Sequence, residues 1–164
     1  SGISIHQLRK EAAELIQGLN ANTLFGLIQF SRSYDLFEDY LVTGTQSNKE
    51  AGVTWLDKEF RTDGKSGRNW IRSEVNGIQS VIKAAFAWQP DVIFIISDGD
   101  FQRTKSSGGS ENVSLEELSR DIHRFQEQSE KDTRIHFVGF QVKPQHKAEL
   151  MNLVGKYNGQ YREL

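Results

Sequence analysis

The feature that most restricts the possible folds is an uninterrupted apolar run that ends in a polar cluster. Residues 92–96, VIFII, contain no polar side chain, and SDGD follows at 97–100. A strand with one exposed face alternates apolar and polar residues, whereas an inner strand of a parallel sheet is apolar throughout because helices cover both of its faces. The run therefore predicts a buried inner strand of a parallel sheet.

Helical and extended patterns alternate along the rest of the chain. Capping boxes at Ser4/Gln7 and Ser114/Glu117 mark two helix starts. Flexible loops are predicted at 61–69 and 104–112. Strands are predicted at 23–30, 34–43, 92–97, 134–140 and 160–163, and helices at 4–18, 47–60, 78–86, 114–125 and from Pro144. This order predicts an α/β fold with a doubly wound, mostly parallel, Rossmann-like sheet, one antiparallel edge strand at 34–43, and helices on both faces.

The first predicted helix has no strand before it. Its long apolar stripe is typical of a helix that connects two parallel strands, yet the helix starts at about the fourth residue. The sheet is therefore expected to lack its first strand in this chain.

Length and composition exclude several classes of protein. The 164 residues predict a single domain, 1–164, and a net charge of -2 with 26% charged residues provides no basic surface for nucleic acid. The chain has no cysteine, which excludes disulfides and thiolate chemistry. The longest apolar runs reach only about a third of a membrane span, so no membrane contact by this chain is expected. Trp70, in a predicted loop, is the aromatic residue expected to meet a partner.

Ser97, Asp98 and Asp100 are the leading site candidates. Ligands of open parallel sheets bind at the carboxyl ends of the strands, where these residues are expected to lie. Two carboxylates there could share a magnesium ion, either in a phosphoester hydrolase or in a metal-bridged binding site. The competing interpretation is a turn in which Asp98 only accepts backbone N–H groups.

Motifs for an enzyme are incomplete. GKS at 64–66 lacks the first glycine of a phosphate-binding loop, because that position is Glu59, and no GxGxxG is present. Phe101 and Gln102 follow the DGD segment in place of the threonine of phosphatase-type sites. The four histidines are dispersed and are expected to be structural or solvated. The sequence therefore favours a protein that is not an enzyme.

Motifs in a consistent order resemble the von Willebrand factor type A domain, particularly its bacterial members. The motifs are FGLIQFS (25–31), AAFAWQPD (84–91), VIFIISDG (92–99) and IHFVGF (135–140), and the ending VGKYNGQYREL (154–164) resembles the closing segment of the family. The resemblance covers nearly the whole chain. It implies a doubly wound sheet with a metal-ion-dependent adhesion site, whose magnesium ion is completed by a carboxylate of a protein partner.

Carried over residue by residue, the resemblance assigns one metal ligand, Asp98, the aspartate that follows the fourth strand. The family's threonine corresponds to about Asn76, with Ser73 and Ser80 as nearby hydroxyls. The Asp-x-Ser-x-Ser motif is absent, since no aspartate precedes Asp35. The first strand that carries this motif would lie centrally, between 24–30 and 92–97. Two inner strands would lack a partner without it, so the gap is expected to close, to be filled by another chain, or to hold a further segment.

These observations predict a non-enzymatic protein–protein interaction domain with an incomplete adhesion site. Asp98 is the candidate metal ligand, and Asn76, Ser97 and Asp100 are candidates for partner binding. The chain itself is expected to bind magnesium weakly or not at all. The alternatives are a magnesium-dependent ligand-binding domain that is competent only in an intact parent, and a magnesium-dependent phosphoester hydrolase that uses Asp98 and Asp100.

Two further expectations concern assembly and compartment. The unpaired inner strands predict self-association of the chain. The compartment is left open by the sequence, and the resemblance is compatible with an extracytoplasmic or membrane-anchored parent whose anchor lies upstream of Ser1.

Overall fold

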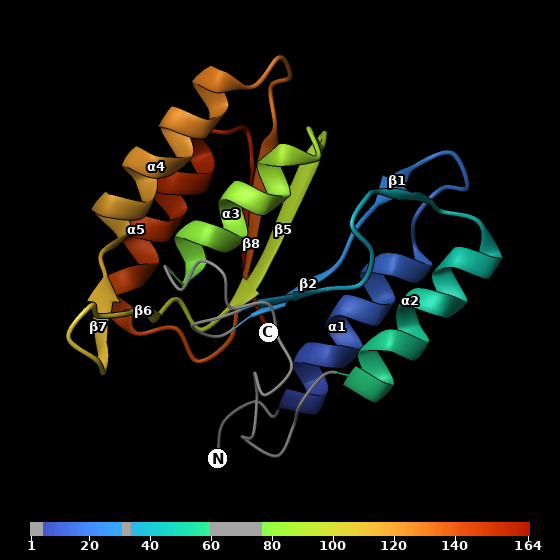
Figure 1. Cartoon of the computed structure of the whole chain (residues 1–164), viewed down its shortest axis with the longest axis horizontal. Coiled ribbons are helices and arrows are strands. Elements are labelled where there is room, and N and C mark those ends of the chain that lie inside the picture. The colour runs from blue at the N-terminus through green and yellow to red at the C-terminus, as the bar shows by residue number, and fades with distance from the viewer. Residues whose placement is uncertain (1–4, 31–33, 60–76) are drawn as a thin grey trace.

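The computed structural model describes residues 5–30, 34–59 and 77–164 (Figure 1). The helices are α1 (Ile5–Gln17), α2 (Gln46–Glu59), α3 (Ile78–Ala87), α4 (Leu115–Gln128) and α5 (Pro144–Gly155). The strands are β1 (Leu24–Phe25), β2 (Ile28–Phe30), β3 (Tyr34–Leu36), β4 (Val42–Thr43), β5 (Val92–Ser97), β6 (Phe101–Thr104), β7 (Ser110–Val113), β8 (Arg134–Gly139) and β9 (Tyr161–Glu163). The predictions for Ser4, 61–69, Trp70, Ser73 and Asn76 fall outside the described residues.

A parallel sheet organises the C-terminal half. The strand order is β5-β8-β9, with β5 and β8 in register from Val92 opposite Arg134 to Ser97 opposite Gly139. Helix α4 packs against both α3 and α5, so the three helices lie side by side (Figure 1). The α/β class with a parallel, Rossmann-like sheet is therefore confirmed.

The helix starts in this half follow from local chemistry. The backbone N–H of Glu117 donates to Ser114 Oγ at 3.1 Å, which confirms the predicted N-cap of α4. Behind this cap, Leu115, Leu118 and Ile122 are buried at helical spacing. Pro144 is the first residue of α5, where its missing N–H leaves no intrahelical hydrogen bond unmade.

The two faces of β5 differ in burial, which corrects the prediction of a strand covered on both faces. Ile95 is buried in the main hydrophobic cluster with Phe137 of β8. On the opposite face, Val92 is 38% exposed and Phe94 is 45% exposed. The Phe94 ring stacks on His136 with 4.9 Å between ring centroids. The apolar run at 92–96 is therefore continuous even though one face of β5 is partly exposed to solvent.

The predicted strands at 23–30 and 34–43 are each divided in two. Strand β1 pairs with β4, and β2 pairs with β3, both antiparallel, so the predicted antiparallel hairpin is present but interrupted. The break falls at Gly26, where an added Cβ would lie 2.7 Å from the ring of Trp88. The side chain of Trp88, the residue that follows α3, thus lies against the backbone at Gly26. A glycine inside a strand commonly marks such a close approach.

Residues 101–113 form an antiparallel hairpin, β6–β7, which corrects the prediction of a flexible loop at 104–112. Gly108 and Gly109 occupy its turn with φ of 92° and 78°. The turn is closed by the N–H of Lys105, which donates to Gly109 O at 3.1 Å. Glycine adopts positive φ without steric cost, so the GG pair turned out to be a hairpin signal.

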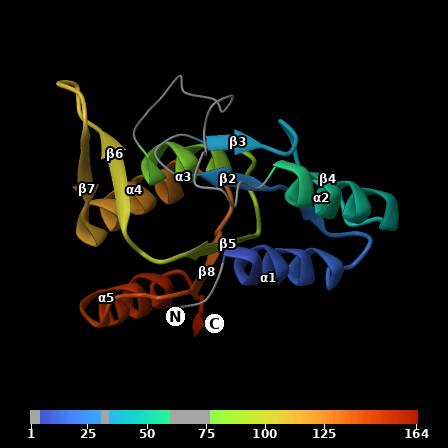
Figure 2. The same ribbon diagram turned by 90° about the horizontal axis from the view of Figure 1, so that it is seen from below.

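The N-terminal half has its own small core. Ile16 of α1, Phe25 of β1 and Leu56 of α2 are its buried members. Figure 2 shows α1 and α2 apart from the group formed by α3, α4 and α5. An ion pair between Glu11 of α1 and Arg162 of β9 connects the halves.

One edge of β5 has no partner among the described strands. Strand β8 pairs with one side of β5, and within 5–30, 34–59 and 77–164 no strand pairs with the other side. In the same ranges β2 pairs with β3 alone. The gap expected between these two inner strands is therefore not closed by pairing them with each other.

Candidate functional site at the carboxyl end of β5

The candidate residues form a tight turn at the end of β5. The N–H of Gly99 donates to Ser97 Oγ at 3.1 Å, and the N–H of Asp100 donates to Asp98 Oδ1 at 3.0 Å. Ser97 is buried, whereas Asp98 is half-buried. Gly99 has φ of 79° and lies against Leu150 of α5. One oxygen of Asp98 therefore serves the turn, as the competing interpretation of this segment predicted.

The carboxylate of Asp100 is paired with two basic side chains from the start of α5. Lys143 Nζ lies 2.9 Å from Oδ2, and His146 Nε2 lies 3.6 Å from Oδ1. The segment after β8 lies here because the carboxyl ends of neighbouring parallel strands meet at one edge of the sheet, and the N–H of Phe140 donates to Ser97 O at 3.2 Å. Sequence reasoning missed Lys143 and His146, although their position just after the adjacent strand was a usable signal.

The described residues at this edge do not fit a magnesium site. Magnesium requires several oxygen ligands in near-octahedral geometry. Asp98 offers one carboxylate with one oxygen in a backbone hydrogen bond, and Asp100 is already paired with the ammonium group of Lys143. No group of three or more histidine or acidic side chains in the described part of the chain could hold a metal ion. Asn76 lies outside the described residues, so the structure does not place it beside Asp98.

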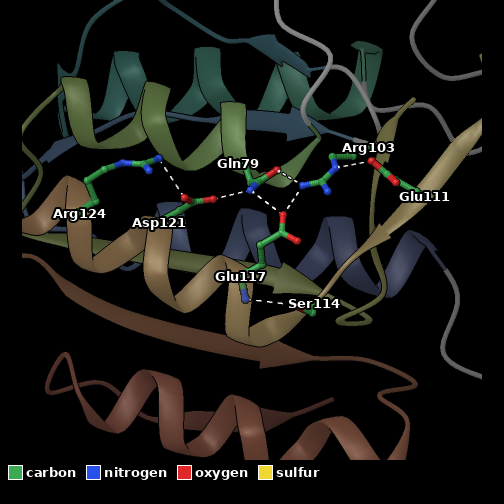
Figure 3. A network of polar contacts seen from close by, with 7 residues as sticks. All are labelled: Gln79, Arg103, Glu111, Ser114, Glu117, Asp121 and Arg124. Carbon is green, nitrogen blue, oxygen red and sulfur yellow. Dashed lines mark hydrogen bonds and ion pairs between the residues drawn. The ribbon is translucent and has the colours of Figure 1, made fainter. Parts of the chain in front are cut away.

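A second polar cluster joins α3, α4 and the β6–β7 hairpin (Figure 3). Arg103 of β6 is its centre: Nε donates to Glu111 at 2.8 Å, and Nη1 donates to Gln79 Oε1 at 3.2 Å and to Glu117. Gln79 Nε2 donates in turn to Glu117 at 3.1 Å and to Asp121. The network therefore fixes the hairpin to the first turn of α4.

Charge pairing shifts the pKa values of two groups in this network. The hydrogen bond from Arg103 lowers the pKa of Glu111 below its ordinary value of 4.5, and the hydrogen bonds to Glu111 and Glu117 raise the pKa of Arg103 above its ordinary value. Both shifts favour the charged forms, because each charge is stabilised by an opposite one nearby. Arg103 and Glu111 thus form a stabilised ion pair at the centre of the cluster.

Comparisons with known proteins show a fold. No family model matches the chain, and no curated protein is detectably similar to it in sequence. A solved structure described as von Willebrand factor type A from Catenulispora acidiphila is similar over 95% of this chain, with a TM-score of 0.55 and 12% identity. The similar region makes up 33% of that structure's chain. The von Willebrand factor A-like fold is confirmed, while the bacterial type, the absent first strand and the metal site stay predictions.

In the described residues, no helix is both long enough and apolar enough to cross a bilayer.

Proposed function

We propose that the chain is a non-enzymatic protein-interaction domain that binds its partner at the carboxyl ends of β5 and β8. The observation that carries this proposal is the position of Asp98, which lies half-buried directly after β5 in a von Willebrand factor A-like sheet. Binding sites of open parallel sheets lie at this edge. The exposed charges of Asp100 and Lys143 beside Asp98 provide polar contacts for a protein surface.

The same contacts support binding over catalysis. A hydrolase that uses Asp98 and Asp100 would need both carboxylates available for metal or substrate. Asp100 is held by Lys143 and His146, and Asp98 closes the turn. Ser97 Oγ accepts a backbone N–H and has no general base among the contacts described for it. A phosphoester hydrolase therefore remains the weaker proposal, and it requires turnover that is lost in Asp98→Ala.

A magnesium-dependent domain, competent in a longer parent protein, is the second candidate. Its support is the open edge of β5, since no described strand pairs with it. A strand added there would end beside Asp98, and its loop could bring the further oxygen ligands that magnesium needs. This candidate predicts that partner binding by the parent depends on magnesium and that binding by the present chain does not.

The experiment uses Asp98→Ala, with Asp91→Ala as the matched control. Asp91 is an exposed aspartate at the opposite end of the same strand, where it pairs with Lys131 at 3.5 Å. Proteins cross-linked to the chain are identified, purified and titrated against each variant by calorimetry. We expect the affinity of the true partner to fall about tenfold in Asp98→Ala, the loss of one charge-assisted contact, and to be unchanged in Asp91→Ala.

Two results would contradict the proposal. Equal affinities for the three proteins would remove Asp98 from the interface. Phosphoesterase activity that disappears in Asp98→Ala would instead establish the hydrolase.

A further inference from the structure

Strands β5 and β8, which lie side by side, present one partly exposed sheet face (Figure 1). Side chains alternate along a strand, so Val92 and Phe94 of β5 share a face with Arg134 and His136, which lie opposite them in β8. On this face Val92 is 38% exposed, Phe94 is 45% exposed, and Arg134 is exposed as well. We call these four residues the exposed sheet face.

The helices of the C-terminal half cover the opposite face of the two strands. Ile95 and Phe137 lie there in one buried cluster with Ile82 of α3, Leu118 of α4 and Leu150 of α5. Parallel sheets of α/β proteins are normally covered on both faces. Neighbouring exposed apolar side chains on such a sheet are typical of a protein contact surface.

Two stacked rings form the centre of the exposed sheet face. The ring of Phe94 lies on that of His136, with 4.9 Å between the ring centroids and 23° between the ring planes. The N–H of Gln160 donates to His136 Nδ1 at 3.0 Å and so holds the second ring in place. Because these rings are already fixed, a partner that packs on them loses little side-chain freedom.

The charges at one end of the exposed sheet face complement each other. Arg134 lies opposite Val92, and its backbone N–H donates to Asp91 O at 2.9 Å, so an acid and a base start side by side from two neighbouring strands. The side chain of Asp91 is 86% exposed and pairs with Lys131 at 3.5 Å. In a two-fold symmetric interface each residue meets its counterpart's neighbour in both directions. A face that carries an acid and a base at the same end therefore fits a second copy of itself.

We propose that two copies of this chain dimerise through the exposed sheet face. The two-fold axis runs parallel to the strands, between β5 and β8, so that β5 of each copy packs over β8 of the other. Phe94 then packs on His136 of the partner subunit, and Arg134 pairs with Asp91 of the partner subunit. Two sheets that pack face to face with nearly aligned strands, about 10 Å apart, are a common arrangement. Both Asp98 turns then lie at the same end of the dimer, and the dimer does not depend on partner binding there.

Charge reversal tests this dimer by sedimentation velocity over a concentration series. The unaltered chain should pass from monomer to dimer as its concentration rises. Arg134→Glu and Asp91→Arg each bring like charges together, so each should raise the dissociation constant of the dimer about tenfold or more. The double variant Asp91→Arg/Arg134→Glu exchanges the two charges and should recover most of the lost affinity. Arg120→Glu, an exposed charge reversal on α4, is the matched control and should have no effect.

Each of the following results would overturn the proposal: a chain that stays monomeric at every concentration, a dimer that both single reversals leave intact, or a double variant that dimerises no better than the single ones. A dimer that both reversals leave intact would have its contact elsewhere, such as at a strand edge. Recovery in the double variant separates a lost contact from misfolding, because this variant carries both substitutions and would share any folding defect. Asp98→Ala should dimerise normally, so failure of partner binding at β5 and failure of the dimer are distinguished.

Discussion

Lys143 Nζ lies 2.9 Å from a carboxylate oxygen of Asp100. The two residues follow neighbouring strands of the parallel sheet, and their pairing neutralises one of the two acids that end the apolar run. A cation bound beside Asp98 would therefore have to compete with a resident ammonium group. This contact gives the strongest physical reason to separate the roles of two acids that are only two residues apart.

Magnesium binding tests this separation. We expect calorimetry to detect no micromolar magnesium site on the chain, because the edge offers too few oxygen ligands. Lys143→Gln should increase the weak affinity for magnesium several-fold, because removing the competing ammonium group makes the Asp100 carboxylate available. Lys156→Gln, at the far end of α5, serves as the control. A micromolar dissociation constant for the unaltered chain would contradict this account.

Gly77 is predicted to be essential for stability. Its φ is 63°, and an added Cβ would lie 1.9 Å from Gln102 O. Gly77→Ala should lower the free energy of unfolding by about 3 kcal/mol, from backbone strain and displacement of β6. Gly155→Ala, where an added Cβ meets nothing within 4 Å, should leave stability unchanged or slightly higher. Urea denaturation measures both, and a similar loss in both variants would refute the steric explanation.

The network around Arg103 should make stability depend on pH in acid. Its hydrogen bond lowers the pKa of Glu111 in the folded state, so this stabilisation is present above the ordinary value of 4.5 and is lost as the pH falls through the lowered value. Arg103→Gln should lower the free energy of unfolding at neutral pH, because Glu111 and Glu117 then lose their cationic partner. Urea denaturation should show a smaller difference in the free energy of unfolding between the unaltered chain and Arg103→Gln well below pH 4.5 than at neutral pH. A cost that does not change with pH would exclude the ion network as its cause.

His136 should titrate below the ordinary histidine value of 6.5. Burial lowers its pKa, and the charge of Arg134 lowers it further. Because the folded-state pKa is depressed, the associated stability is present above 6.5 and is lost as the pH falls through the lowered value. NMR titration of the ring should give a midpoint below 6.5 that rises in Arg134→Gln and not in Arg120→Gln. An unchanged titration midpoint in Arg134→Gln would show that the charge of Arg134 does not lower the pKa of His136.

We expect self-association of the chain to depend on the partly exposed face of β5. Phe94 is 45% exposed there, next to the strand edge that no described strand covers. Phe94→Lys should shift the chain toward monomer in sedimentation velocity, since charged residues on edge strands oppose pairing. Met151→Lys is the control, because Met151 is 55% exposed on α5. A chain that is monomeric at every concentration, or that responds equally to both changes, would contradict the prediction.

Local patterns were sufficient for much of the C-terminal half of the fold, although the β6–β7 hairpin was predicted as a loop. The capping serine and apolar spacing of α4 predicted its start and its buried face, and the run at 92–96 predicted the strand that positions Asp98. These signals lie within one element or at its end, so no knowledge of distant contacts was needed. The position of Asp98 was predictable for the same reason.

Distant contacts account for what the sequence did not predict. The break in the strand at 23–30 depends on the ring of Trp88 lying against Gly26, more than sixty residues away in the chain. The contacts of Arg103 with Gln79 and Glu117 join three separate elements. The pairing of Asp100 with Lys143 and His146 likewise depends on β8 lying beside β5, because it joins segments that follow two different strands.

The division of the interior into two apolar clusters has a consequence for how this chain can change over time. Ile16, Phe25 and Leu56 form a cluster separate from the one that supports β5 and α4. Substitutions at sites that share no contacts act nearly additively on stability. The helical pair α1–α2 can therefore diverge in sequence while the sheet edge that carries Asp98 keeps its geometry.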